Sequence, residues 1–266
     1  MARRLAGEPV CGLRVALFGP FAVQVGGQPL PRLRSRAGQW LLALVVLRHG
    51  QEVSREWLAG TLWPDSPDEL ALYNLRRNLV DLRHALGPEA CRLHSPTPRT
   101  LRLDVSSAFV DVLAFDELVA RADWASLESA TRLYRGPLLE GCTEYWIYPE
   151  REARQQAYLR ALEKLAEHAL ALGEHSVAVS YLCRLIAVEP LRDSAQRALM
   201  RALADGGDMP AAVLVYREYR TRLHRELNME PDAQTCVLFS QIQAAARREG
   251  AGRRRRAQTE RIASGP

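Results

Sequence analysis

The stretch ELALYNLRRNLVDLRHAL, residues 69–86, carries leucines that recur at spacings of three and four. The leucines of this stripe are Leu72, Leu75, Leu79, Leu82 and Leu86. Such spacing lines up one side of an α-helix, because each residue turns the helix by about 100°. The opposite face carries Tyr73, Arg77, Val80 and His84. Since Gly87-Pro88 is a typical C-terminal stop, we predict an amphipathic helix over Leu70–Leu86 with its leucines buried.

The polar face of this predicted helix suits the major groove of DNA. Arg and Asn side chains make bidentate contacts to the edges of guanine and adenine. The candidate base readers on this helix are Asn74, Arg77 and His84. Arg76 and Arg83 lie on the flank between the two faces, where they are better placed to contact phosphate. A solvated amphipathic helix with incidental arginines is the alternative, and this helix alone does not decide between the two.

Length and composition favour two domains in a cytoplasmic protein. The chain has 266 residues and 47% hydrophobic content, which is ordinary for globular domains. The longest apolar run, residues 40–47, is too short to cross a membrane, and no signal-peptide segment follows the N-terminus. The cysteines number five and form no CxxC pair, which is typical of reduced thiols in the cytoplasm.

Charge is divided unevenly along the chain. Residues 1–111 carry 14 arginines against 10 acidic residues, whereas residues 112–246 carry 15 basic against 19 acidic residues. Residues 247–266 carry 7 arginines against 2 acidic residues. A basic head, an acidic body and a basic tail indicate different partners for the three segments. Lysine occurs only at Lys164, so a GC-rich genome explains the abundance of arginine, and that abundance alone does not indicate nucleic-acid binding.

A small sheet and two helices are predicted before the leucine-striped helix. Residues 1–12 are expected to form a loose leader, and alternating apolar residues over 13–25 predict an antiparallel sheet. Two serines are candidate N-caps. The helices that they begin are predicted over 36–48, after Ser35, and 55–63, after Ser54. Trp57 and Trp63 are expected to pack between helices.

A hairpin is predicted after the leucine-striped helix, from residues 91–93 and 100–103. Its tip carries Arg99 and Thr100. A sheet, three helices and a terminal hairpin in this order are typical of a winged helix, a helix-turn-helix variant with a β wing. We therefore predict an α+β winged-helix domain over residues 13–111.

An all-α domain is predicted for residues 112–246, where apolar residues follow helical spacing. Residues 173–178 and 207–212 are similar and are offset by 34 positions, the period of tetratricopeptide helix pairs. We therefore expect a tetratricopeptide-like fold. Residues 247–266 lack apolar periodicity and are predicted to be a disordered Arg-rich tail. A solvated tail is favoured over a non-specific phosphate contact through Arg253–Arg256.

The sequence contains no pattern typical of catalysis or metal binding. It has neither a GxxxxGK[ST] phosphate loop nor a GxSxG nucleophile elbow. His168 and His175 are seven residues apart and have no cysteine nearby, so surface positions are favoured over a metal site. We therefore expect no enzyme activity, no cofactor and no metal, which also disfavours a nucleotide-hydrolysing regulator.

Two blocks of residues carry a resemblance to a known family. The first comprises Val53–Ala59, Leu62–Asp65, Asn74–Arg76 and Leu82–Gly87. It resembles the DNA-binding domain of the SARP-type antibiotic-regulatory activators, whose winged helix is of the OmpR class. The second comprises Tyr134–Gly141, Trp146, Glu150-Arg151, Glu189–Leu191, Ala212, Tyr216, Leu227 and Glu230-Pro231. It is similar to the bacterial transcriptional activation domain of that family, a helical tetratricopeptide-like unit, and the resemblance covers about residues 13–243.

This resemblance implies a regulator that binds direct repeats near promoters and contacts RNA polymerase. The expected partners are double-stranded promoter DNA, RNA polymerase and a second copy of the chain on direct repeats. Longer members append an ATPase and sensor region, and this chain resembles the short form. Asp81 departs from the expected pattern, because an acid on the outer face disfavours a phosphate contact there, and the Arg-rich tail is not carried over from the family. By resemblance to OmpR-class winged helices, the loop Pro64–Pro67 is a secondary candidate for polymerase contact.

We therefore interpret the chain as a sequence-specific DNA-binding transcriptional regulator, and as an activator. Arg36 and Arg55 each follow a Ser cap and are expected to meet backbone phosphates at helix N-termini. Arg99 and Thr100 are expected to reach the minor groove or the backbone. The alternative is a helical-repeat adaptor without sequence-specific DNA binding, which the acidic body favours. Binding to mixed genomic DNA at varied salt separates the two, since only a regulator leaves a salt-resistant, selective fraction.

Overall fold

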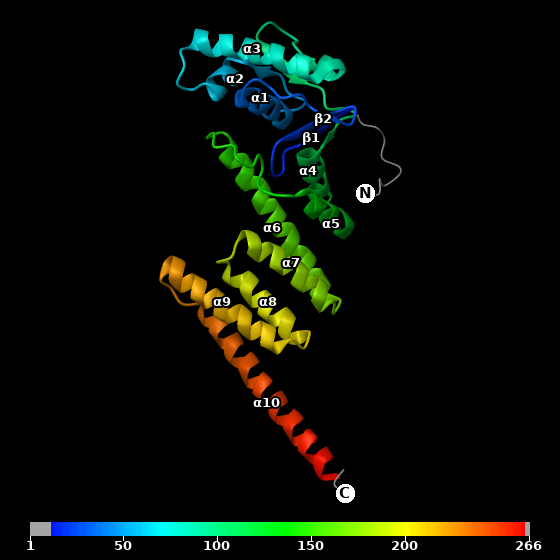
Figure 1. Ribbon diagram of the computed structural model, residues 1–266, viewed down its shortest axis with the longest axis vertical. Helices are drawn as coiled ribbons and strands as arrows, with labels where there is room; N and C mark the ends of the chain where they lie inside the picture. The colour runs from blue at the N-terminus through cyan, green and yellow to red at the C-terminus, as the bar shows by residue number, and fades with distance from the viewer. Residues whose placement is uncertain (1–11, 264–266) are drawn as a thin grey trace. The chain divides into compact units, whose positions relative to one another are not determined.

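The computed structural model describes residues 12–263, with side chains up to Arg248, and contains two compact units (Figure 1). Unit 1 ends at Gln156 and unit 2 begins at Ala157, inside the long helix α6, Ile147–Ala171. A small sheet region near the N-terminus is followed by helices, which confirms the predicted order in outline. Residues 1–11 of the predicted leader lie outside the described residues.

Four short strands form the first sheet of unit 1, in the order β3-β2-β1-β7. They are β1 Leu13–Ala16, β2 Ala22–Val25, β3 Gln28–Pro29 and β7 Phe109–Val110. β1 and β2 pair antiparallel, with Leu13 opposite Val25, as the alternating apolar pattern predicts. Gly26 and Gly27 connect β2 to β3 at φ values of 56° and 80°, a conformation that glycine adopts without strain. β7 pairs parallel to β1, a long-range contact that local pattern does not reveal.

Three helices of unit 1 pack on one another. They are α1 Arg36–Leu47, α2 Arg55–Leu62 and α3 Asp68–Leu86. Ser35 and Ser54 accept backbone N–H groups at the starts of α1 and α2, which confirms both predicted caps. The buried residues of α3 are Ala71, Leu75, Leu79, Leu82 and Leu86.

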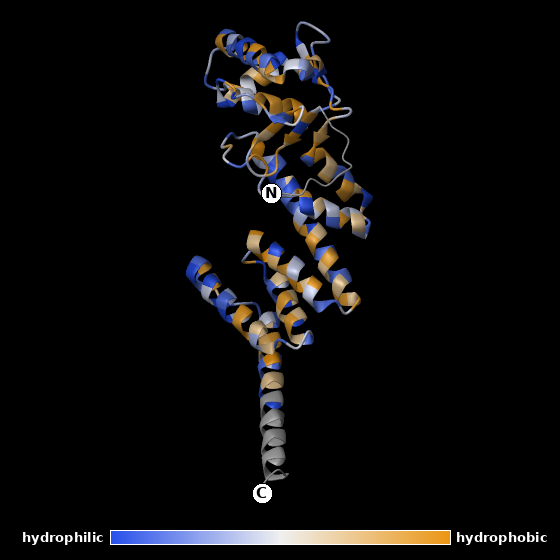
Figure 2. Ribbon diagram, turned by 45° about the vertical axis from the view of Figure 1, so that its right-hand side comes forward, coloured by the Kyte–Doolittle hydropathy of each residue, from blue (hydrophilic) through white to orange (hydrophobic). Residues whose placement is uncertain are grey.

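The leucine side of α3 fixes which face of the helix points outward. Burying each leucine contributes about 1.5–3 kcal/mol relative to leaving it exposed. Leu72, predicted to belong to the stripe, is only half-buried. Figure 2 shows the resulting contrast, with hydrophobic colour in the middle of unit 1 and hydrophilic colour along much of α3. The polar face predicted for α3 is therefore free to meet a partner.

A second sheet has three strands in the order β4-β6-β5, of which β4 precedes α2 and the other two follow α3. Its strands are β4 Val53–Ser54, β5 Leu93–His94 and β6 Thr100–Leu103. β5 and β6 pair antiparallel and form the predicted hairpin. The first strand is shorter than predicted, because residues 87–92 form the 3-10 helix η1, Gly87–Arg92. The Arg92 guanidinium donates to the Glu89 carboxylate and to the Ser106 carbonyl, which holds this turn in place.

Unit 1 also contains α4, Asp111–Arg121, α5, Trp124–Leu133, and a later segment that bonds to the residues following β1. Leu139 N–H donates to the Leu17 carbonyl at 2.7 Å, and Glu140 N–H donates to the Gly19 carbonyl at 2.8 Å. The buried Asp111 carboxylate accepts the N–H groups of Leu17 and Phe18. Burial raises the pKa of Asp111 above its usual range. These hydrogen bonds join residues 17–19 to residues 111–140, so the first compact unit extends beyond residue 111, where the change of composition predicts a domain boundary.

Unit 2 is built from antiparallel helices. They are the second part of α6, α7 His175–Val188, α8 Asp193–Asp205, α9 Met209–Leu227 and α10 Ala233–Ala263. Ala178 and Ala212, which are equivalent in the 34-residue offset, are both fully buried. Such small side chains let neighbouring helices approach closely, which agrees with the predicted repeat.

Helix α10 extends through Ala263, so the backbone is helical where the sequence predicts a disordered tail. The residues there are mainly Ala, Arg, Gln and Glu, which have high helix propensity. In residues 12–263, no helix combines the length and the apolar character that crossing a membrane requires. The same described residues contain no group of three His, Cys, Asp or Glu side chains that could hold a metal ion.

Candidate nucleic-acid interface

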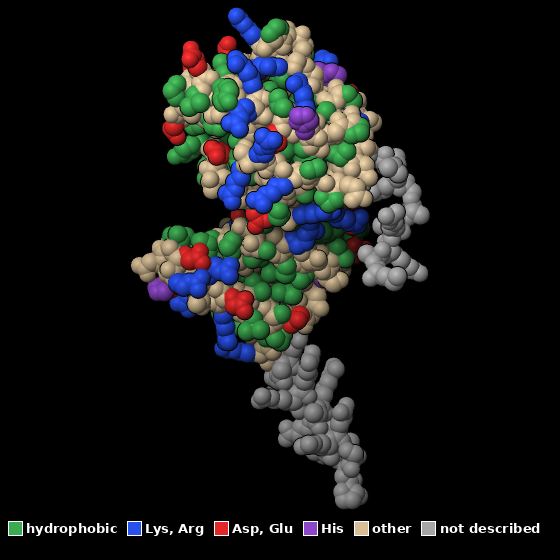
Figure 3. Space-filling view, turned by 45° about the horizontal axis from the view of Figure 1, so that its top comes forward, with side chains coloured by type: hydrophobic (Ala, Val, Ile, Leu, Met, Phe, Trp, Pro, Cys, Tyr) green, Lys and Arg blue, Asp and Glu red, His purple; other side chains and the backbone are tan. Residues whose placement is uncertain are grey.

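The outer face of α3 is exposed along its whole length. The exposed side chains along its middle are Tyr73, Arg77, Val80 and His84. Tyr73 is 51% exposed, and the Arg77 guanidinium lies 5.8 Å from the centre of its ring, within reach of a cation–π contact. In Figure 3, which brings the α3 side of unit 1 forward, arginine and histidine side chains run across the surface. The predicted base readers Arg77 and His84 are therefore accessible.

Three arginines gather on the flank of α3 that adjoins the β5–β6 hairpin. The Ser95 hydroxyl oxygen accepts hydrogen bonds from Arg55 at 2.9 Å and from Arg83 at 3.0 Å. Burial, with Arg83 and Arg76 nearby, lowers the pKa of the Arg55 guanidinium. The Nε atom of Arg55 is buried without a hydrogen-bond partner. We call Arg55, Arg76, Arg83 and Ser95 the arginine cluster.

The arginine cluster carries no internal counter-charge. The ion pairs found within the described part of the chain leave Arg55, Arg76 and Arg83 without an acidic partner. Three like charges this close repel one another, and an anion bound between them would relieve that repulsion. Guanidinium groups match phosphate oxygens in charge and in hydrogen-bonding geometry. The cluster therefore has the chemistry of a phosphate site.

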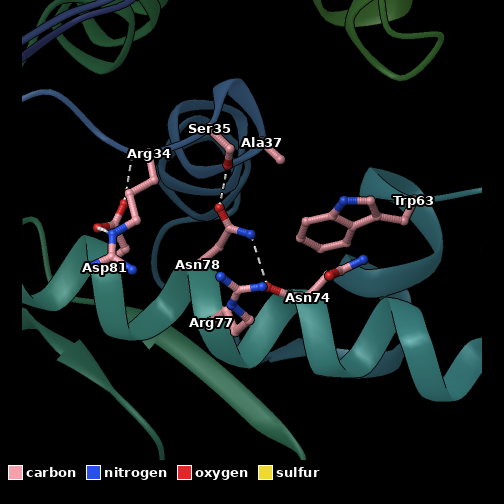
Figure 4. A pocket seen from close by; sticks show the side chains of 8 residues that line it. All are labelled: Arg34, Ser35, Ala37, Trp63, Asn74, Arg77, Asn78 and Asp81. Atoms are coloured by element: carbon pink, nitrogen blue, oxygen red, sulfur yellow. Dashed lines mark hydrogen bonds and ion pairs between the residues drawn. The ribbon is translucent and has the colours of Figure 1, made fainter.

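The opposite flank of α3 faces the start of α1 across a pocket of about 300 Å³. Its lining residues, drawn in Figure 4, are Arg34, Ser35, Ala37, Trp63, Asn74, Arg77, Asn78 and Asp81. The Ser35 hydroxyl donates to Asn78 Oδ1 at 2.5 Å, and Asn78 Nδ2 donates to the Asn74 carbonyl at 2.9 Å. Asn78 thus ties the N-cap of α1 to α3. Asn74, a predicted base reader, is half-buried beside this network.

Asp81 belongs to this flank and is engaged within the protein. Its carboxylate accepts the backbone N–H of Arg34 at 2.9 Å and pairs with the Arg34 guanidinium at 3.4 Å. The carboxyl side chain is only 19% exposed. The acid predicted for the outer face therefore holds the segment before α1 to α3, and the Arg34 guanidinium offsets its charge.

The remaining predicted site residues lie at several places. Arg36 is exposed at the first position of α1. Arg99 is exposed at the hairpin, and its carbonyl accepts the backbone N–H of Arg55 at 2.8 Å. That N–H is the helix-terminal donor that would otherwise meet a phosphate, so only the Arg55 side chain is available. The Thr100 hydroxyl donates to Glu52 Oε2 at 2.9 Å, so it is engaged within the protein.

Tertiary structure adds contacts that sequence reasoning does not foresee. Ser95 and Asn78 are absent from the predicted site, because neither belongs to a local motif. Trp57 is 40% exposed, with the Arg48 guanidinium 5.3 Å from the centre of its ring, so the prediction that it packs between helices is wrong. Its ring meets the side chain of Arg48, the C-cap residue of α1, on one face and is otherwise partly open to solvent. Trp63 is half-buried and lines the pocket beside α1.

Comparison with known proteins identifies the class. Residues 110–243 match the family model of the bacterial transcriptional activator domain. The transcriptional regulatory protein MoaR1 of Mycobacterium tuberculosis is 29% identical over 247 residues, which cover 85% of this chain and 78% of MoaR1. The regulatory protein AfsR of Streptomyces coelicolor is 28% identical over 234 residues, which cover 82% of this chain but only 23% of AfsR.

A solved structure shares the fold. The structure of Mycobacterium tuberculosis EmbR in complex with a low-affinity phosphopeptide superposes with a TM-score of 0.66 at 22% identity, covering 88% of this chain and 65% of the EmbR chain. Together the matches define the chain as a bacterial transcriptional regulator. It belongs to the SARP family of transcriptional activators, as the resemblance of its motifs implies.

Proposed function

We propose that this regulator is a sequence-specific DNA-binding activator. In this proposal the three helices and the β5–β6 hairpin of unit 1 form a winged helix, and α3 enters the major groove. The observation that carries the proposal is the arginine cluster. Its three unpaired cations flank the exposed face of α3, where a duplex entered by that helix would present its phosphate backbone.

The cluster and the face of α3 would divide the work of recognition. Phosphate contacts fix the position of a protein on DNA, and contacts to base edges specify the sequence. Arg55, Arg76 and Arg83 would hold one stretch of backbone through the cluster. Arg77 and His84, which lie on the exposed middle of α3, would then reach the base edges.

The other predicted contacts follow from the same docking. Arg36 at the start of α1 would hold the backbone on the second flank. Arg99 at the hairpin would reach the backbone or the minor groove, whereas Thr100 would have to leave Glu52 to do so. Asn74 would need a small side-chain rotation out of the pocket beside α1.

The acidic helical body would serve protein partners rather than DNA. Tetratricopeptide-like helices stack into extended surfaces suited to proteins, and residues 112–246 carry 19 acidic against 15 basic residues. We assign RNA polymerase as the partner that activation requires, and direct repeats would bring two copies side by side. Contact between those copies would raise their affinity by effective concentration.

The first experiment measures binding of the full chain to mixed genomic DNA at several salt concentrations. A selective fraction that survives higher salt supports the proposal, and equal loss of all sequences supports an adaptor instead. On the selected site, Arg77→Ala should cost about 1–3 kcal/mol, and much less on random DNA. Equal losses on both would make Arg77 a phosphate contact.

The second experiment tests the role of unit 2, which contains the repeat helices of the body. In vitro transcription with purified RNA polymerase would compare the full chain with a fragment ending at Gln156, where the compact first unit ends. The fragment should occupy the DNA site without activating transcription. Full activation by the fragment, at concentrations that saturate the site equally, would move the polymerase contact into unit 1.

A further inference from the structure

The exposed middle of α3 contains one apolar side chain among polar and aromatic ones. Val80 is 53% exposed, and it lies one helical turn from both Arg77 and His84. The buried side of α3 is formed by other residues, Ala71, Leu75, Leu79, Leu82 and Leu86. Val80 therefore contributes nothing to the core that holds the helix.

Valine is also a poor choice for an exposed helical position. Its branched Cβ restricts the side chain against the preceding turn, so Val has a lower helix propensity than Ala, Arg or Gln. At this position no burial within the chain compensates for that cost. The exposed Val80 side chain, between Arg77 and His84, is therefore placed to contact an apolar group of a bound partner.

We infer that Val80 is a specificity-determining residue that contacts the C5-methyl group of thymine. Among the atoms that base pairs present in the major groove, that methyl is the apolar one, and small aliphatic side chains contact it. The inference rests on the proposed function and adds to it a base that the polar residues of α3 do not read. Arg77 distinguishes guanine by hydrogen bonds, and Val80 distinguishes thymine by van der Waals contact.

Helix geometry places this thymine close to the guanine read by Arg77. Three residues of α-helix advance by about 4.5 Å, at about 1.5 Å per residue. Successive bases along one strand are about 3.4 Å apart. The thymine therefore lies one or two base pairs from that guanine.

The test uses the full chain and a DNA site selected by it from random sequence. Each thymine of the site is replaced in turn by deoxyuridine, which removes only the methyl group. One thymine, within two base pairs of the guanine sensitive to Arg77→Ala, should lose about fourfold in affinity, the effect of one apolar carbon leaving a contact. Val80→Ala should bind the thymine and deoxyuridine sites equally.

Val80→Ile, which keeps an aliphatic branched side chain, is the matched control and should keep the preference for thymine. Both variants should fold, since position 80 is exposed and alanine favours the helix. The inference is overturned if deoxyuridine has no effect at any position, or if Val80→Ala retains the full loss. Failure to select any DNA sequence would instead overturn the proposed function, and the inference with it.

Discussion

The two flanks of α3 differ in how their polar groups are satisfied. On the flank beside α1, Asn78 bonds to Ser35, and Asp81 bonds to Arg34, so each polar group has a partner within the chain. On the hairpin flank, Arg55 and Arg83 share the Ser95 hydroxyl, and within the described residues neither they nor the neighbouring Arg76 pairs with an acid. Satisfied groups stabilise a fold, whereas an accumulation of unpaired like charge indicates a partner that the chain does not supply. We therefore expect the α1 flank to stabilise the fold and the hairpin flank to bind a partner.

The largest effect is expected in the core that both flanks share. Leu82 is fully buried on the inner side of α3, so Leu82→Ala should lower the free energy of unfolding by about 2–5 kcal/mol. Denaturant unfolding of the full chain measures this. An unchanged midpoint combined with lost DNA binding would mean that the leucines face a partner, and both flanks would need new assignments.

A smaller loss of stability is expected on the α1 flank. Asn78→Ala leaves the Ser35 hydroxyl without its acceptor and should lower the free energy of unfolding by about 1–2 kcal/mol. Because Asn78 is engaged within the protein, the salt dependence of DNA binding should stay as in the unmodified chain. A changed salt dependence with unchanged stability would make Asn78 a DNA contact and remove the difference between the flanks.

The hairpin flank should show the opposite result. Arg55→Gln removes one of three repelling cations, so the free energy of unfolding should stay within about 0.5 kcal/mol or rise slightly. Arg132→Gln is the matched control. Arg132 is an exposed residue of α5, and among the described residues it forms an ion pair only with Glu128. A loss above about 2 kcal/mol for Arg55→Gln would show that the cluster is structural.

Local sequence patterns predict α3 and its two preceding helices well. The leucine spacing determines the buried side of α3, and the two serine caps depend only on neighbouring residues. The family could also be predicted, because its motifs are distributed along the chain in a specific order. The arginines Arg76 and Arg83 could be assigned to the flank from helical rotation alone.

The arginine cluster itself could not be predicted, because it depends on contacts between distant segments. Arg55 and Ser95 are 40 residues apart, and Asn78 and Ser35 are 43 residues apart. The exposure of Trp57 likewise follows from how α2 packs and from no property of its own segment. Helical periodicity gives the direction of a side chain, whereas its partner is decided by tertiary packing.

The salt dependence of DNA binding tests the central claim most directly. Each phosphate contact contributes about one unit to the slope of log affinity against log salt concentration. The full chain carrying Arg76→Gln and Arg83→Gln should therefore lose about two units of slope on its selected site, while Arg132→Gln loses none. An unchanged slope in the double variant would contradict the assignment of the arginine cluster to the DNA backbone.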